Sequence, residues 1–239
     1  MFALLAALAL SGSPQTPPPT PRPDPAGMGA ALRKEREALS AYQWRLATKL
    51  TVNDALRLEK TENVHLGPGG VLDRRVLTFE RKPEPPPLPE DDPRARLARP
   101  TPKPDDDERF EDAAQALMDL YATLPAERVS EWAKAASLKP PDPDRPGLLR
   151  VMGRGLGRPQ DDVTLFLDQA TGLPKEIEIK TTVDARIREI AFLRISLEAV
   201  SEVKRDPPLI VPRHIFLNMT KGSHRVKLEM ETSDYRPWP

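Results

Sequence analysis

The sequence predicts an α+β protein built on one curved antiparallel sheet, a half-barrel of about nine strands, with two or three helices covering the concave face. Strand-length runs follow one another through residues 162–233, and apolar and polar residues alternate within them, as Val226, Leu228 and Met230 do between charged neighbours. A period of two gives one buried and one wet face. Short turns between successive strands are typical of an antiparallel meander. A sheet this wide curls, and its apolar face needs a covering layer.

The first residues predict an export signal. Residues 2–10 form an unbroken apolar run, which has the length of a signal-peptide core and falls far short of the ~20 residues that span a bilayer. Ala9-Leu10-Ser11 is a small-x-small cleavage site, so residues 1–11 are expected to be a cleaved signal peptide and the protein to be periplasmic. The start carries no Lys or Arg, which leaves a plain hydrophobic start as the alternative. No transmembrane span is expected elsewhere.

Residues 12–27, rich in Pro and Thr, predict a disordered spacer. A single domain is expected over residues 28–239. The expected strands are 41–52, 55–66, 71–82, 148–156, 162–168, 174–183, 186–199, 209–220 and 224–233. In the second of these, Leu56, Leu58 and Val64 are predicted to share one side.

Between the third and fourth expected strands, a proline-rich stretch is followed by two segments with helical spacing of apolar residues. Residues 83–104 are dense in proline, which neither a helix nor a central strand tolerates, so a long surface loop is predicted. Apolar residues then recur at helical spacing from Phe110 to Leu124, and a further helix is expected from about Pro125 until Pro140 ends it. A short amphipathic helix over residues 28–40 completes the helical set.

Several short motifs resemble the periplasmic lipoprotein-carrier (LolA-like) superfamily and its outer-membrane lipoprotein-sorting relatives. They are the run Leu165-Phe-Leu-Asp168-x-x-Thr171-Gly172-Leu173-Pro174, the later Leu209-Ile-Val-Pro212-Arg-His-Ile, and the final Ser233-Asp-Tyr235. The resemblance covers roughly residues 30–82 and 148–236. The proline-rich segment at 83–104 is a departure from it, and no arginine matches the one that gates the carrier's cavity.

The resemblance implies a half-open barrel plugged by helices, with an apolar cavity that holds acyl chains. The expected function is therefore an exported, non-enzymatic binding protein for an acyl chain, a lipoprotein or another apolar ligand. The alternative is an envelope interaction or stress-sensor module that acts through contacts with a partner protein and whose core is filled by side chains. Candidate cavity residues are Tyr42, Trp44, Leu46, Leu117, Tyr121, Leu165, Leu167, Ile177 and Ile179.

Composition and motifs give no support for an enzyme, a cofactor or a metal site. Lys and Arg (36) balance Asp and Glu (36), so net charge predicts no nucleic-acid partner. Cysteine is absent, which excludes disulfides and thiolate chemistry. Gly153-Arg-Gly155-Leu-Gly157 precedes a strand, whereas a phosphate-binding loop opens a helix, so a turn is predicted. Asp161-Asp162 is interpreted as a solvated turn rather than an acid–base pair.

The three histidines are not expected to converge on a zinc or triad site. With a hairpin turn at Lys221-Gly222, His214 is predicted to lie opposite Glu229, and His224 opposite Met219. The two side chains would then be several rungs apart on one sheet.

Overall fold

The structure is a computed structural model that describes residues 33–67, 70–83, 104–122, 124–184, 189–200, 203, 208–222 and 224–239. For residues 104–108, 119, 122, 183 and 184 only the backbone is described. The predicted signal peptide at 1–11, the spacer at 12–27 and the predicted loop between residues 83 and 104 lie outside the described residues.

The described residues confirm the predicted fold class. Ten antiparallel strands form one open sheet in the order β3-β2-β1-β10-β9-β8-β7-β6-β5-β4. The strands are β1 (Tyr42–Val52), β2 (Ala55–Leu66), β3 (Leu72–Arg81), β4 (Ser137–Lys139), β5 (Leu148–Arg154), β6 (Asp162–Asp168), β7 (Pro174–Asp184), β8 (Glu189–Ala199), β9 (Ile210–Lys221) and β10 (His224–Pro237). The helices are residues 33–39, α2 (Pro104–Ala122) and α3 (Ala126–Ala135).

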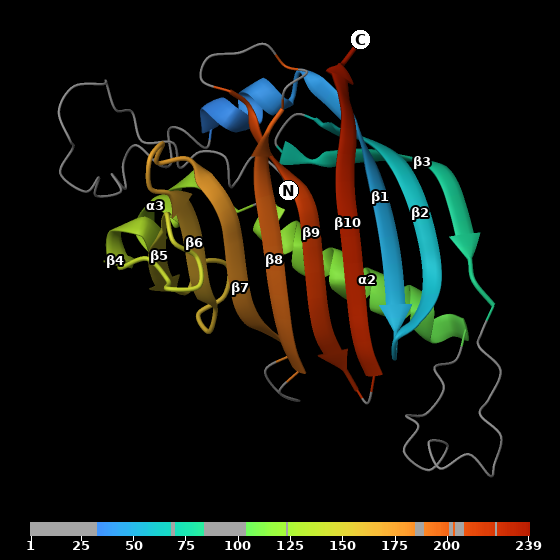
Figure 1. Cartoon of the computed structure of the whole chain (residues 1–239). Helices are drawn as coiled ribbons and strands as arrows, with labels where there is room; N and C mark the ends of the chain where they lie inside the picture. The colour runs from blue at the N-terminus through green and yellow to red at the C-terminus, as the bar shows by residue number, and fades with distance from the viewer. Residues whose placement is uncertain are drawn as a thin grey trace.

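The strand order explains why helices cover one face. β3 and β4 follow each other along the chain, yet they lie at opposite edges of the sheet. The chain between them must therefore cross the full width of the sheet, and α2 and α3 lie in that connection. Figure 1 shows α2 running behind β9, β10 and β1. We call the face under the helices the concave face and the opposite one the outer face.

Alternation of residues along the strands decides what each face presents. In β1, the alternate residues Trp44, Leu46, Thr48, Leu50 and Val52 are buried, and the residues between them are more exposed. β10 shows the same alternation at Val226, Leu228 and Met230, as predicted. Concave-face side chains of β1 and β2 and of β5 to β10 join those of the helices in one hydrophobic core.

Two expectations about β2 and α3 were wrong. The predicted common side for Leu56, Leu58 and Val64 fails because a β-bulge lies near Arg57, where Leu50 pairs with Leu58 and Thr51 pairs with Leu56. The extra residue reverses the alternation, so Leu56 is 37% exposed.

The helix predicted to run to Pro140 instead ends at Ala135, and its C-cap residue Ala136 has extended dihedral angles. Residues 137–139 form the tenth strand, β4, by pairing with β5. Local apolar spacing could not anticipate this edge strand, because its hydrogen bonds come from a partner strand.

The Asp168 motif has a structural role in the turn between β6 and β7. One Asp168 carboxylate oxygen accepts hydrogen bonds from the backbone N–H of Ala170 (3.0 Å) and of Thr171 (2.8 Å), and from the Thr171 hydroxyl (2.9 Å). These bonds with Thr171 hold the pKa of Asp168 below its usual value. Gly172 follows at a φ of +69°, which suits glycine. Turn chemistry thus accounts for Asp168, Thr171 and Gly172 in one of the three motifs on which the family resemblance rests.

Candidate functional site

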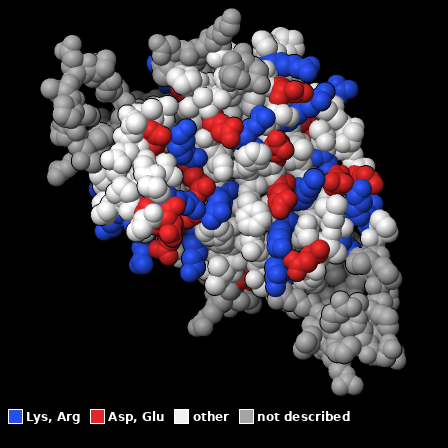
Figure 2. Space-filling view, viewed as in Figure 1, with Lys and Arg blue, Asp and Glu red and all other residues white. Residues whose placement is uncertain are grey.

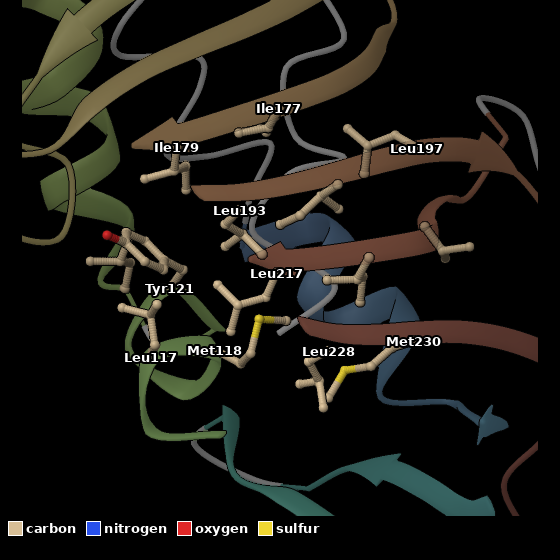
Figure 3. Close-up of a cluster of buried hydrophobic side chains, with 14 of the residues drawn as sticks. Leu117, Met118, Tyr121, Ile177, Ile179, Leu193, Leu197, Leu217, Leu228 and Met230 are labelled. Atoms are coloured by element: carbon tan, nitrogen blue, oxygen red, sulfur yellow. The ribbon is translucent and has the colours of Figure 1, made fainter. Parts of the chain in front are cut away.

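The predicted cavity residues belong to, or pack against, one apolar core between the sheet and the helices. Eight of them are at most 2% exposed, and Tyr42 is half-buried and packs against the same core. In Figure 3, Leu117, Met118 and Tyr121 of α2 point toward Ile177, Ile179, Leu193, Leu217, Leu228 and Met230 of the sheet. The nine residues therefore share one apolar core, and their role in lining a ligand cavity stays a prediction.

This group is tightly packed. Leu46, Leu117 and Tyr121 are 1% exposed, and Ile179 is fully buried. A void large enough for a water molecule beside any of these side chains would leave part of its surface accessible. The near-zero values therefore mean that side chains fill the space around them, at the density usual for protein interiors. Any ligand here must displace a covering element rather than enter a ready-made cavity.

A row of polar side chains links α2 to β2 and β3. Lys60 on β2 donates a hydrogen bond to Glu111 of α2 at 2.5 Å, and Arg74 on β3 donates one to Gln115 of α2 at 2.7 Å. Glu62, only 3% exposed, lies 3.5 Å from the Lys60 ammonium and 3.9 Å from the Arg74 guanidinium. We call these five residues the α2 latch. Ion pairs at such partly buried sites are screened less by salt than exposed ones.

Sequence reasoning missed the α2 latch, although a signal was present. Lys60 and Glu62 face Thr48 and Leu46 across the β1–β2 pair, so they occupy concave-face positions between Leu58 and Val64. Two charged residues at positions that alternation assigns to a core indicate a polar contact within that core.

A second polar group lies at the other end of α2. Asp161 is fully buried, and the interpretation of Asp161-Asp162 as a solvated turn was wrong for its first member. Its carboxylate accepts hydrogen bonds from the N–H groups of Gly157 (2.8 Å) and Arg158 (2.7 Å) and from the Thr181 hydroxyl (2.6 Å). These bonds hold the turn between β5 and β6 against β7. With its acceptor capacity used structurally, Asp161 is poorly placed for proton transfer.

The buried hydroxyl of Tyr121 makes no hydrogen bond of normal geometry with the described residues. Burial raises the pKa of Tyr121 well above its usual value, and the Asp161 carboxylate acts in the same direction. A raised pKa in the folded state means that its contribution to stability is complete below the unfolded pKa of about 10 and is lost as the pH rises above it.

We therefore expect the wild type to lose stability above about pH 10 more steeply than Tyr121→Phe. The difference in slope should be about 1.4 kcal/mol per pH unit, because only the unfolded state releases this proton. Urea unfolding at a series of alkaline pH values measures both slopes. Parallel curves for the two proteins would show that Tyr121 ionises as readily in the folded state.

The Gly153-x-Gly155-x-Gly157 run lies at the end of β5 and in the turn that follows, as predicted, and each glycine has a packing or backbone reason. A Cβ on Gly153 would lie 2.6 Å from the Trp132 indole nitrogen, and one on Gly157 would lie 2.8 Å from the Tyr121 ring. Gly155 has a φ of +73°, which other residues rarely adopt. The run lets Trp132 of α3 and Tyr121 of α2 approach the sheet closely.

Gly153→Ala is expected to lower the free energy of unfolding by about 1–3 kcal/mol, because the added methyl group overpacks the Trp132 contact. A second glycine such as Gly70 is not a suitable control, because its positive φ would add backbone strain to the alanine variant. Ser137→Ala, exposed on the neighbouring strand β4, serves as the control. Thermal unfolding of both variants tests this. An unchanged Gly153→Ala protein would mean that α3 moves freely on the sheet.

The histidines do not converge, although their predicted register was wrong by two residues. His214 lies opposite Glu231, and His224 lies opposite Lys221. His65 stacks on Trp238 at 3.8 Å. Within the described part of the chain, no three His, Asp or Glu side chains are grouped so that they could hold a metal ion.

Comparisons with known proteins give a distant likeness among solved structures. No family model and no curated protein matches the chain. Among solved structures, the chain is similar to a LolA superfamily protein from Nitrosomonas europaea, with a TM-score of 0.42 and 14% sequence identity over 87% of this chain and 92% of that one. A likeness at this level concerns overall fold and says nothing about ligand or partner. Among the described helices, none combines the length and apolar character needed to cross a bilayer.

Proposed function

We propose that this protein is a non-enzymatic binding protein that takes up an apolar ligand of the acyl-chain type, free or as part of a lipoprotein, between the concave face of the sheet and α2. The observation that carries the proposal is the composition of this layer. Apolar side chains from neighbouring strands form one continuous surface under α2, and side-chain contacts of the α2 latch join that helix to β2 and β3.

A helix held in this way is displaced at lower cost than a strand, since no backbone hydrogen bonds to the sheet are broken. The core between α2 and the sheet contains Met118 of α2 and Met219 and Met230 of the sheet. Methionine side chains are unbranched and adapt to differently shaped apolar partners. Displacement of α2 would thus expose a surface able to repack around an acyl chain.

A locked α2 tests this proposal. The chain has no native cysteine, so Lys60→Cys/Glu111→Cys can be joined by a short bis-maleimide. We expect the wild type and the uncoupled double variant to bind a fluorescent fatty acid, and the cross-linked protein to lose binding. The two single-cysteine variants treated with the same reagent are the controls. Equal binding by the cross-linked protein would rule out displacement of α2.

A second candidate function is an interaction module whose core is filled permanently and which acts through contacts with an envelope protein. The observation that favours it is the near-zero exposure of the candidate cavity residues, such as Leu117 and Ile179. Native mass spectrometry of the purified protein separates the two candidates. Co-purified lipid supports the binding protein, whereas a lipid-free mass together with no fatty-acid binding supports the interaction module.

Export is part of the proposal and rests on the apolar run at residues 2–10. A signal-peptide core of this length is removed after translocation, so the mature chain should begin near Gly12. N-terminal sequencing of protein from the periplasmic fraction tests this. Intact Met1 on that material, or purely cytoplasmic fractionation, would contradict it.

A further inference from the structure

The outer face of the sheet carries a groove that the concave-face function does not use. It has a volume of about 310 Å³ and crosses β1, β10, β9 and β8. Two neighbouring rungs supply most of its lining: Ala47, Glu231, His214 and Ser196 on one rung, and Lys49, Glu229, Phe216 and Arg194 on the next.

Side-chain size explains the hollow. The two short side chains, Ala47 and Ser196, stand at the ends of the first rung, next to Lys49 and Arg194 on the second. Successive side chains on one face of a strand are about 7 Å apart. Lys49 and Arg194 therefore form the two walls of the groove, and the short side chains of Ala47 and Ser196 leave space beside them. The ring of Phe216, which is half-buried, lies between these walls.

Most charges around the groove are matched within the protein. Lys49 lies 3.5 Å from Glu59 of β2, and Arg194 lies 3.1 Å from Glu178 of β7. Figure 2 shows the same mixture of basic and acidic side chains across the outer face. Both cations at the groove's walls are thus neutralised by carboxylates that lie outside it.

Glu229 and Glu231 differ from this pattern. Both are exposed, and neither forms an ion pair or a side-chain hydrogen bond with another described residue. They lie on the same face of β10, two residues apart, and both line the groove. The groove therefore contains two carboxylates without an ion pair beside the aromatic rings of Phe216 and His214, and Lys49 lies opposite Glu229.

We infer that this groove binds an arginine side chain presented by a partner protein. A guanidinium stacks on aromatic rings and donates paired hydrogen bonds to carboxylates, and this combination of groups lines the groove. A lysine ammonium is a compact, strongly hydrated charge that gains less from the rings. A metal ion is a poorer fit, because no three ligating side chains converge within the described residues. The site does not depend on a ligand under α2.

Amide NMR of the isotope-labelled full chain tests the inference with acetyl-Arg-Arg-amide, and with the citrulline and lysine analogues as probes. We expect saturable shifts at Ala47, Ser196, His214 and Phe216 with the arginine probe, on the order of millimolar affinity for such a small ligand. The citrulline probe, which is neutral and similar in shape, should give none, and the lysine probe should bind more weakly.

Variants of the two glutamates test whether the arginine probe binds in the groove. Glu229→Gln/Glu231→Gln should weaken binding of the arginine probe about tenfold, as expected for the loss of two exposed charge contacts. Asp73→Asn/Glu198→Gln removes the same net charge outside the groove and should bind like the wild type. Equal weakening in both variants, shifts spread over other surfaces, equal binding of the citrulline or lysine probe, or no saturable shift would each overturn the inference.

Discussion

Trp44→Ala is expected to lower the free energy of unfolding by about 3–5 kcal/mol, the range observed when a buried Trp or Phe is truncated. Trp44 is 1% exposed and stacks on Tyr235 with ring centroids 5.8 Å apart. It belongs to the common core, whose packed side chains close the space left by truncation only in part. Because the region around Trp44 is filled, the full cost of a cavity should appear.

Trp238→Ala is the matched control for this measurement. Trp238 is 44% exposed and contacts His65 by stacking, so its removal should cost about 1 kcal/mol or less. Urea unfolding followed by circular dichroism compares both variants with the wild type. If Trp44→Ala costs no more than Trp238→Ala, empty space already lies beside Trp44, and a preformed ligand cavity becomes the better description.

Asp161→Ala is expected to cost about 3 kcal/mol. The change removes three hydrogen bonds to a buried carboxylate and leaves two backbone N–H groups and the Thr181 hydroxyl without their acceptor. Unsatisfied buried donors each cost about 1–3 kcal/mol, and partial access of water to Gly157 and Arg158 reduces the total.

The adjacent Asp162 provides an internal comparison for this prediction. Its side chain is 55% exposed and pairs with Arg154, itself 84% exposed, so Asp162→Ala should change stability by less than about 1 kcal/mol. Thermal and urea unfolding of the two alanine variants give the difference. Similar losses for both would show that the turn between β5 and β6 is held by something other than the Asp161 carboxylate.

The sequence alone could not predict that Asp161 is buried while Asp162 is exposed. Both follow Gln160 in a polar, proline-containing turn, and local chemistry treats them alike. Burial of Asp161 arises because Thr181, twenty residues away, brings its hydroxyl to the carboxylate. The same limit applies to β4 and to the bulge near Arg57, where pairing with a distant strand decides the conformation.

The sequence by itself determined nine of the ten strands, most of their alternation and hence most of the side chains that share the core. Period-two patterning is a local property, so Trp44, Leu165 and Ile179 could be assigned to one apolar face before their neighbours were known. It also identified the turn role of the Gly153–Gly157 run from the strand that follows it.

Only the tertiary structure decided what the two faces of the sheet do. Whether α2 leaves a cavity depends on the fit of Leu117 and Tyr121 against strands far away in sequence, and the fit is close. The α2 latch joins residues about fifty positions apart, such as Lys60 and Glu111, and the outer-face groove joins four strands through their register. Packing and cross-strand register are properties of the assembled sheet, because each residue's neighbours are set by the whole chain.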